Sequence, residues 1–412
     1  MLTKNNSINS TATLSLIVGA LLLSTVACSK PTADNLEEAS TRYQATANSD
    51  TSTQTSDEMP TFITKTIATF DEPWAMTALP KQSNEPLQFL ITQKTGELFI
   101  VNTAAGTKTA ISGIPKVAYG GQGGLGDVVL APDFALSHII YLSYVEADSD
   151  NHFGAKVIKA QVIGLDTKNP SLQTVTPIWE QVPKVEGQGH YSHRLLVSPD
   201  GQYLYISSGE RQKKDPAQDM NANLGKIIRL NLDGSIPNDN PFLKQKNNIS
   251  QQLWTTGHRN VLGMAFDDKG RLWAHEMGPR GGDEFNLIIK GKNYGWPIVS
   301  NGRNYTGIDI PDHDTRPEFT APKISWTPVI SPSSLSIYTS GTHNDFPAWQ
   351  DNALISGLSS KALIVVAIDN EQAAERYRYD MGERIRSVLA VDGEVWLLED
   401  GEEAKLLQLI AQ

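Results

Sequence analysis

The sequence contains almost no cysteine. Among its 412 residues Cys28 is the only one, so no disulfide can form within the chain. One apolar run, "LSLIVGALLLSTVA" (residues 14–27), stands near the N-terminus and is too short for a typical transmembrane helix. The sequence therefore predicts neither an intrachain cross-link nor a membrane-spanning helix at this run.

Basic residues are also in deficit. Lys and Arg number 35 against 46 Asp and Glu, which gives a net charge of −11. An acidic surface argues against a nucleic-acid partner, because phosphate binding needs a basic face. Any anionic ligand must instead be held by a few specifically placed Arg or Lys side chains. No G-x-G-x-x-G motif stands between a strand and a helix, which argues against a nicotinamide-binding enzyme.

The N-terminus has the features of an export signal. Lys4 precedes the apolar run, which ends in small residues directly before Cys28. The ending "STVAC" resembles a bacterial lipoprotein box, so residues 1–27 are predicted to be a lipoprotein signal peptide and Cys28 the lipidated first residue. This places the protein on the periplasmic side of a Gram-negative envelope, with a lipid anchor in the outer membrane as its only membrane contact. The alternative is a plain secretory signal with an incidental cysteine.

Residues 28–60 are rich in Ser, Thr, Ala, Asp and Glu and nearly lack large apolar side chains. Such a segment cannot bury enough surface to offset its ordering entropy. We therefore expect a flexible tether between the lipid and a domain at 61–412.

From residue 61 onward a β pattern recurs: an apolar strand, a tight turn with Asp, Gly or Asn, and a second apolar strand. Repeated antiparallel modules predict an all-β, six-bladed β-propeller, in which "TFITKTIATF" (61–70) closes the ring beside "AKLLQLIAQ" (404–412). Two β-sandwich domains are the rival architecture, but no linker divides the chain. The six units are "FLITQKTGELFIVN", "DVVLAPDFALSHIIYLSY", "RLLVSPDGQYLYISSG", "GMAFDDKGRLWAHE", "AWQDNALISGL" and "SVLAVDGEVWLLED".

Five longer motifs carry a resemblance to a known family. In chain order they are "GQGGLGDVVLAPDF", "LGKIIRLNLDGSIPNDNPF", "TGHRN", "GPRGGDEFNLIIKGKNYGWP" and "GERIRSV". Together they resemble the soluble, pyrroloquinoline-quinone (PQQ)-dependent sugar dehydrogenases of the glucose/sorbosone dehydrogenase family, especially its aldose sugar dehydrogenase branch. The resemblance implies a six-bladed propeller that oxidises aldoses to lactones with PQQ and Ca²⁺.

A calcium site is expected in "HEMGPRGGDEFNLIIKGKNYGW" (275–296). Calcium prefers oxygen ligands, and glycines let backbone carbonyls approach an ion closely. The resemblance implies that the carbonyls of Gly278 and Pro279 hold the calcium that touches the quinone, and that Glu284 and Tyr294 contribute to a second, structural calcium. The alternative is that Asp283 and Glu284 are a solvated loop pair.

The candidate general base is His190, in "VEGQGHYSHRLLV", because histidine is the usual base near neutral pH. The family places its catalytic histidine immediately before this strand. His193 stands where the family usually has a small residue, which leaves open which histidine is the base. A metal site on the two histidines is a further alternative, although a third soft ligand is lacking. Glu210 in "SSGERQ" is a candidate to orient His190.

Arg259 and Asn260, from "GHRN", are expected beside the quinone, where the arginine would stabilise developing charge. The alternative for Arg259 is an ion pair with an acidic neighbour. Arg384 and Arg386 in "RIRSV" alternate along a predicted strand and share a face. Two like charges there favour a bound carboxylate, so we expect them to clamp the tricarboxylate cofactor.

Three further cofactor contacts follow from the resemblance. Gln122 matches a family contact, and Trp326 matches a family aromatic residue, with an ordinary core position as its alternative. The family's lysine in the fifth blade is replaced here by Ser359, and Lys361 two residues on is the candidate substitute.

The leading function is therefore a quinoprotein dehydrogenase, expected to be monomeric, that passes electrons from aldose sugars to an external acceptor of the respiratory chain. A calcium-bearing propeller that acts as a lactonase or binds a ligand without a redox cofactor is the alternative. A purely structural lipoprotein would explain the tether but not His190, Arg259 and "RIRSV" together.

Overall fold

The computed structural model describes residues 42, 43, 45, 46, 59–81 and 85–412. The predicted signal peptide, Cys28 and most of the predicted tether lie outside these residues. Within the tether segment, β1 (Arg42–Tyr43) pairs with β3 (Phe62–Phe70) and β2 (Ala45–Thr46) pairs with β23 (Gln372–Asp380), so these four residues belong to the sheets. None of the helices in the described part of the chain has the length and hydrophobicity that crossing a bilayer requires.

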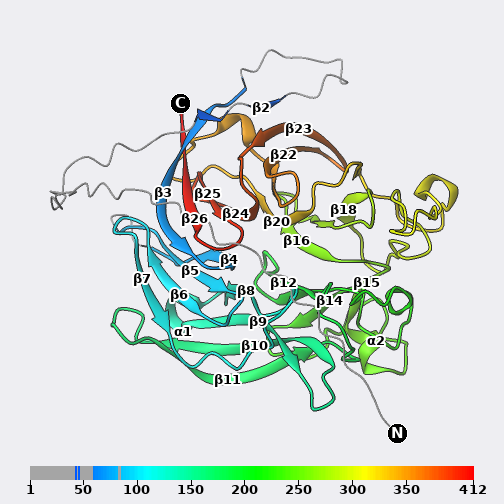
Figure 1. The fold of residues 1–412 in the computed structure, drawn as a ribbon. Helices are drawn as coiled ribbons and strands as arrows, with labels where there is room; N and C mark the ends of the chain where they lie inside the picture. Colours follow the sequence, from blue (N-terminus) through cyan, green and yellow to red (C-terminus); the bar gives the residue numbers. More distant parts are fainter. Residues whose placement is uncertain (1–41, 44, 47–58, 82–84) are drawn as a thin grey trace, which may run out of the picture. The chain divides into compact units, whose positions relative to one another are not determined.

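Six antiparallel sheets surround a common centre as the blades of a β-propeller (Figure 1). In each of the first five blades the chain runs strand by strand across the sheet. The first three blades are β4 (Pro73–Ala78), β5 (Gln88–Gln93), β6 (Leu98–Asn102) and β7 (Thr107–Ile111); β8 (Leu125–Leu130), β9 (Ile139–Ala147), β10 (Phe153–Ile163) and β11 (Ser171–Glu180); and β12 (Ser192–Val197), β13 (Tyr203–Ser208), β14 (Lys226–Asn231) and β15 (Leu253–Thr256).

The remaining three blades follow the same plan. The fourth and fifth are β16 (Val261–Phe266), β17 (Leu272–Glu276), β18 (Asp283–Ile288) and β19 (Ile324–Trp326); and β20 (Pro332–Ile337), β21 (Ala353–Gly357), β22 (Ala362–Asp369) and β23. The sixth combines β24 (Ile385–Val391), β25 (Glu394–Glu399), β26 (Ala404–Ala411) and β3.

The ring closes between the first long strand and the last. β3 pairs antiparallel with β26, with Phe62 opposite Ala411 and Phe70 opposite Ala404, and Figure 1 shows the blue strand beside the red one. This is the closure that the sequence predicts. The prediction of an all-β, six-bladed propeller is confirmed, and the two-sandwich alternative is set aside.

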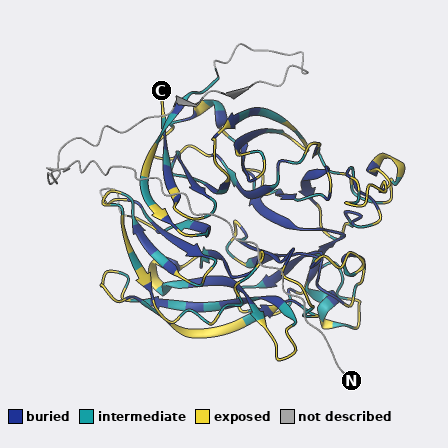
Figure 2. Ribbon diagram, viewed as in Figure 1, coloured by how far each residue is buried: buried dark blue, intermediate teal, exposed yellow. Residues whose placement is uncertain are grey.

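Burial falls from the centre outward. The second strands are almost fully buried, whereas the outer strand β11 exposes most of its length (Figure 2). Apolar side chains on both faces of the inner strands pack between neighbouring blades, as in other face-to-face sheets. Each of the six interfaces has its own apolar cluster; Leu90 and Leu142, for example, meet between the first and second blades.

Helices are few and short among the described residues. Asn247 caps α2 through a side-chain bond from the Ile249 N–H of 2.8 Å. The helical turns therefore serve as connections, and the short loop after β17 and the long loop after β18 are left to build the site. The helices are α1 (Phe134–Ser137) and α2 (Asn248–Gln252), and the 3₁₀ turns are η1 (Asp215–Ala217), η2 (His313–Thr315) and η3 (Pro347–Trp349).

Candidate active site

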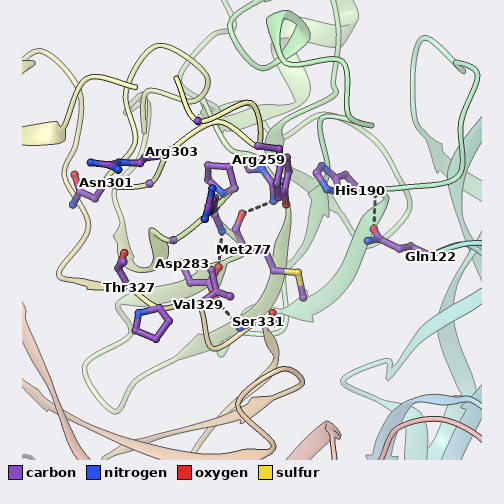
Figure 3. A pocket seen from close by; sticks show the side chains of 18 residues that line it. Gln122, His190, Arg259, Met277, Asp283, Asn301, Arg303, Thr327, Val329 and Ser331 are labelled. Atoms are coloured by element: carbon purple, nitrogen blue, oxygen red, sulfur yellow. Dashed lines mark hydrogen bonds between the residues drawn. The ribbon is translucent and has the colours of Figure 1, made fainter. Parts of the chain in front are cut away.

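The six innermost strands all begin beside two adjoining cavities. Each pairs with the second strand of its blade through a register shift near its start, and such bulges commonly re-aim side chains beside active sites. The main cavity has a volume of about 780 Å³ and the second cavity about 370 Å³. Gln122, Met277 and Ser331 line both, so the two cavities adjoin each other; Figure 3 shows the residues around the main cavity.

His190 is held in the main cavity by three neighbours. Its backbone has a φ of 49°, which lies in the left-handed region that residues other than glycine seldom adopt. The His190 N–H donates to Gln122 Oε1 at 2.6 Å (Figure 3). Its Nδ1 bonds to Glu210 Oε1 at 2.5 Å. A Cβ at Gly209 would collide with the His190 carbonyl, so this close approach needs glycine. The structure thus places Glu210 where it can orient His190, as the sequence suggested, and adds Gln122 as a neighbour that the sequence did not indicate.

The protonation of this pair suits a general base. Burial lowers the pKa of His190; its bond to Glu210 acts in the opposite direction, and the charge of Arg259 adds to the lowering. Burial alone would raise the pKa of Glu210, but the bond from His190 holds it below its usual range. At neutral pH the imidazole is therefore neutral, with its proton on Nδ1 facing the carboxylate. Nε2 has no hydrogen-bond partner among the described residues and is the available basic nitrogen.

His193 has a different environment. Its ring stacks on Trp74 at a centroid distance of 4.8 Å, and its Nδ1 bonds to Ser143 Oγ at 2.8 Å. Burial lowers the pKa of His193 to about 3, so this ring stays neutral and serves packing. Gly126 makes room for it, because a Cβ there would overlap the imidazole. In the part of the chain that the structure describes, no group of three or more His, Cys, Asp or Glu side chains could hold a metal.

Arg259 reaches the main cavity next to His190 (Figure 3). Its Nη1 donates to the Met277 carbonyl at 2.9 Å and its Nη2 to Tyr305 Oη at 3.2 Å. The guanidinium makes no ion pair with any described acid, so its charge remains available to a ligand. The alternative for Arg259, an ion pair with an acidic neighbour, is therefore wrong. Asn260 lines the second cavity, and its Oδ1 accepts from Ser192 Oγ at 3.0 Å.

Two segments enclose Asp283: the loop after β17 and the segment between β19 and β20. Asp283 Oδ1 accepts from the Gly278 N–H at 2.7 Å, and Oδ2 accepts from the N–H groups of Ile330 and Ser331 at 2.8 and 2.7 Å. Burial raises the pKa of Asp283 to about 6, although these three hydrogen bonds act to lower it. Asp283 and Glu284 are 1% and 7% exposed, so they are not a solvated loop pair.

Backbone carbonyls converge beside Gly278. A Cβ at Gly278 would collide with the carbonyl oxygens of Gly281 and Gly282, so the loop coils tightly only with glycine there. Gly278 and Pro279 both line the main cavity. A loop of oxygen donors with a buried carboxylate beneath it fits a hard cation such as calcium.

Glu284 and Tyr294 line a very small cavity of about 10 Å³, together with Glu276. Burial raises the pKa of Glu284 and the charge of Glu276 adds to the rise, while the hydrogen bond to His313 acts in the opposite direction. Asn286 Nδ2 donates to Glu284 Oε2 at 3.1 Å, while its Oδ1 is buried without a hydrogen-bond partner among the described residues.

Glu284 Oε1 also bonds to His313 Nε2 at 3.3 Å, and Glu276 bonds to His258 Nδ1 at 2.8 Å and accepts from the Arg259 N–H at 2.6 Å. The two carboxylates offer the oxygen ligands that calcium prefers, and an ion bound there would compete with these partners.

The hydroxyl of Tyr294 is not one of the available oxygens. It donates to the Leu287 carbonyl at 2.6 Å and accepts from the Ile289 N–H at 2.9 Å. Sequence reasoning missed Glu276, whose place at the end of β17, opposite Glu284 in the ladder, was the available signal.

Arg384 and Arg386 line the second cavity, as the alternation of "RIRSV" predicts. Sequence reasoning missed Asp400, the carboxylate that pairs with both arginines. Asp400 Oδ2 lies 2.7 Å from Arg384 Nε, and Asp400 Oδ1 lies 2.6 Å from Arg386 Nη2. Burial alone would raise the pKa of Asp400, but the two guanidinium groups hold it below its usual range. One carboxylate for two arginines leaves a net positive charge.

A second ion pair on the wall of the second cavity was also missed. Lys94 Nζ lies 2.9 Å from Glu72 Oε1. Both residues flank turns of the first blade, where the sequence shows nothing beyond ordinary loop charges.

Two predicted cofactor contacts lie outside both cavities. Trp326 is 6% exposed in the apolar cluster between the fourth and fifth blades, and its Nε1 donates to Glu375 Oε2 at 2.7 Å. It takes the core position that the sequence left as the alternative. Lys361 is corrected as well: its Nζ donates to the Gly382 carbonyl at 2.8 Å and lies 3.7 Å from Glu383 Oε2, away from the cavity walls. Ser359 Oγ bonds to Ser331 Oγ at 2.8 Å.

The chain matches a known protein family over nearly the whole propeller. The sequence profile of the glucose/sorbosone dehydrogenase family matches residues 70–408, which include every strand from β4 to β25 and all the candidate residues. The chain belongs to the glucose/sorbosone dehydrogenase family. The resemblance seen in the sequence motifs is thereby confirmed, and the chain stands among oxidoreductases.

Relatives of this glucose/sorbosone dehydrogenase family member agree in sequence and in fold. The chain is 38% identical over 350 residues to the aldose sugar dehydrogenase YliI of Escherichia coli (strain K12), covering 82% of this chain and 90% of the relative. The apo-form structure of the soluble aldose sugar dehydrogenase from Escherichia coli matches with a TM-score of 0.76 and 36% identity over 84% of this chain and 98% of that one. The PQQ-bound aldose sugar dehydrogenase of Streptomyces coelicolor matches with a TM-score of 0.69 and 26% identity over 84% and 97%.

Proposed function

We propose that the protein oxidises the anomeric carbon of aldose sugars to lactones, with PQQ as the hydride acceptor. One observation carries the proposal. A neutral histidine with a free Nε2, backed by a buried carboxylate, lies next to an arginine without an ion pair in one cavity of about 780 Å³. Family membership and the PQQ-bound relative support the choice of reaction.

In this proposal His190 Nε2 takes the proton of the anomeric hydroxyl. Glu210 keeps the imidazole in the required tautomer and stabilises the imidazolium that forms. Arg259, which is almost fully buried, donates hydrogen bonds to oxygen atoms on which negative charge develops. A positioned base of this kind contributes about 10²–10⁴-fold to the rate.

PQQ, when bound, supplies the two-electron oxidant that no side chain of the protein can provide. The second cavity would hold its carboxylates, since Arg384 and Arg386 retain one net positive charge there beside Asp400. Gln122 and Asn260 would add hydrogen bonds from the adjoining wall.

Calcium would be held by the carbonyls of Gly278 and Pro279, and a second ion by Glu284 with Glu276. The first would supply Lewis acidity next to the quinone. The second would offset the mutual repulsion of two buried carboxylates, which is a structural role.

We further propose that the protein works on the periplasmic side of a Gram-negative envelope as a lipid-anchored monomer that feeds electrons to a respiratory acceptor. Support comes only from the run that ends at Cys28. Mass spectrometry of the mature N-terminus tests this: a diacylglyceryl group on Cys28 is expected, and an unmodified N-terminus beyond Cys28 would contradict it.

Reconstitution tests the main proposal. The purified chain is mixed with PQQ and Ca²⁺ and assayed for dye reduction with a panel of aldoses. Activity is expected only with both additions, and a chelator present during reconstitution should prevent it. Addition of sugar should also bleach the absorbance of the oxidised quinone.

Parallel lactone hydrolysis separates the alternative function. A lactonase needs calcium alone and is indifferent to the quinone. Failure of every aldose to reduce dye, together with failure of PQQ to bind, would rule out the dehydrogenase.

A further inference from the structure

A small hairpin at residues 303–309 forms one wall of the main cavity. The backbone of Arg303 forms isolated antiparallel β-bridges with Arg280 on one side and with Asp309 on the other. The Asn304 N–H donates to the Ile308 carbonyl at 3.0 Å, which closes a tight turn at the tip. The backbone of this hairpin is thus tied to the same loop that presents Gly278 and Pro279.

The tip of the hairpin exposes two large apolar side chains. Tyr305 is 73% exposed and Ile308 is 68% exposed. Only Tyr305 of the two lines the main cavity. Aromatic surface left in water at a cavity mouth commonly marks a place that a ligand covers.

Tyr305 is also fixed in place from within the site. Its hydroxyl accepts a hydrogen bond from Arg259 Nη2 at 3.2 Å, and Arg259 is itself anchored by its bond to the Met277 carbonyl at 2.9 Å. The Arg259 guanidinium lies 5.3 Å from the centre of the Trp296 ring on its other side. Because the hydroxyl is tethered, the tyrosine ring loses little further freedom when something packs against it.

We propose that Tyr305 is a substrate-contact residue that packs against the ring of a cyclic aldose in the main cavity. This inference rests on the proposed function. A pyranose ring presents C–H groups on its faces and hydroxyl groups around its edge. An amphipathic aromatic ring can cover such a face, while polar groups deeper in the cavity, His190 Nε2 and Arg259, meet the hydroxyl edge.

Steady-state kinetics of the reconstituted holoenzyme test the contact. Tyr305→Ala is expected to raise KM for D-glucose and D-xylose about three- to tenfold, the range of one aromatic contact, with kcat at saturating sugar within about twofold of the wild type. Tyr305→Phe keeps the ring and should stay within about twofold in KM. Ile308→Ala is the matched control, since Ile308 shares the hairpin and the exposure but not the cavity, and it should leave KM unchanged.

Two kinetic outcomes would overturn the inference. Tyr305→Ala with an unchanged KM and a lowered kcat would show that Tyr305 serves Arg259 instead of the sugar. An equal rise in KM for Ile308→Ala would show that the whole hairpin matters, without a specific ring contact.

Direct binding keeps this test independent of turnover. Saturation-transfer NMR with D-glucose, on wild type and Tyr305→Ala incubated with PQQ and Ca²⁺, reports the contact even if no dye is reduced. Weaker transfer to the ring protons of glucose in the variant supports the inference. Equal transfer in both proteins, or no transfer in the wild type, overturns it, whereas absent dye reduction with intact transfer overturns only the proposed function.

Discussion

Replacing Glu210 by glutamine tests how the structure prepares its base. Glu210 accepts two hydrogen bonds: Oε1 binds His190 Nδ1 at 2.5 Å, and Oε2 accepts from the Lys214 N–H at 2.5 Å. Glutamine has the same shape but only one acceptor oxygen. If that oxygen faces His190, the amide N–H₂ meets the Lys214 N–H, and donor opposes donor. If it faces Lys214, the amide donates to His190 Nδ1 and moves the imidazole proton to Nε2.

Either arrangement damages the base. In the second, Nε2 carries a proton and cannot accept another, so Glu210→Gln should lower kcat by about 10²–10⁴-fold, the full contribution of a positioned base. In the first, His190 keeps a hydrogen bond to a neutral oxygen but loses the charge-assisted one, which is worth about 1.5–3 kcal/mol, so its pKa falls.

The direction of the pH change follows from the same contacts. Burial already lowers the pKa of His190, and Glu210 is the group that raises it. Removal of the Glu210 charge therefore lowers the pKa further, and the acid limb of the kcat/KM profile should move to lower pH.

The assay is the pH dependence of kcat/KM with saturating PQQ and Ca²⁺, with cofactor titrations and melting curves showing that the variant is folded and loaded. Lys361→Ala, an exposed charge outside the cavities, is the control. A profile that is unchanged, or whose acid limb moves to higher pH, would refute the assignment of Glu210.

Three further predictions concern the cofactor clamp, the carbonyl loop and the second histidine. Arg386→Ala should weaken PQQ binding about tenfold or more, and Arg384→Ala less, because the Arg384 side chain is 47% exposed against 13%; equal, unchanged titration curves would contradict this. Gly278→Ala should abolish calcium-dependent stabilisation in melting curves, since its Cβ collides with two carbonyls, whereas Gly270→Ala should retain it, because its Cβ meets no atom and the strain at its φ of 74° lowers the melting temperature equally with and without calcium. In the folded protein the pKa of His193 is about 3, below its value in the unfolded chain. Its contribution to the free energy of unfolding is therefore present near pH 7 and declines as the pH falls from about 6.5 toward 3, by at most about 1.4 kcal/mol per pH unit. Urea titrations of His193→Gln should show a smaller loss of stability on acidification than those of the wild type, and parallel curves would contradict the prediction.

Much of the fold could be predicted because it is local. In the second, third, fourth and sixth blades the recurring sequence unit is the hairpin of the first two strands, and in the first blade it is the hairpin of β5 and β6. In the fifth blade the unit "AWQDNALISGL" contains only β21. The position of the site follows as well, since Gln122, His190, Arg259 and Ser331 each directly precede or closely precede an innermost strand. A propeller collects the starts of these strands at one face, so residues far apart in sequence meet there.

The remainder depends on register and on loops. Asp400 could have been found by counting along the hairpin "SVLAVDGEVWLLED", because Ile385 pairs with Glu399 and brings the next residue beside the arginines. Trp326 and Lys361 could not be placed from sequence, since their positions depend on how an outer strand and a turn pack against a neighbouring blade. Tyr305 carries no motif at all; only the course of a loop of more than 30 residues between β18 and β19 brings it over the main cavity.

The rigidity that such a site needs comes from a layer just below it. Arg194, on β12, donates through Nε to the Leu262 carbonyl at 2.7 Å and through Nη2 to the Ser333 carbonyl at 2.8 Å. Its guanidinium lies 3.6 Å from Asp127 Oδ1 and 3.8 Å from the centre of the Trp74 ring. One buried side chain therefore joins five of the six blades. Burial lowers the pKa of Arg194 to about 10, so it stays charged at neutral pH, and a charge so deeply buried is tolerated only where every blade keeps its partner in place. The first residues of the innermost strands are therefore held in fixed positions next to Arg194. Differences in substrate preference must then come from the loops around the cavity.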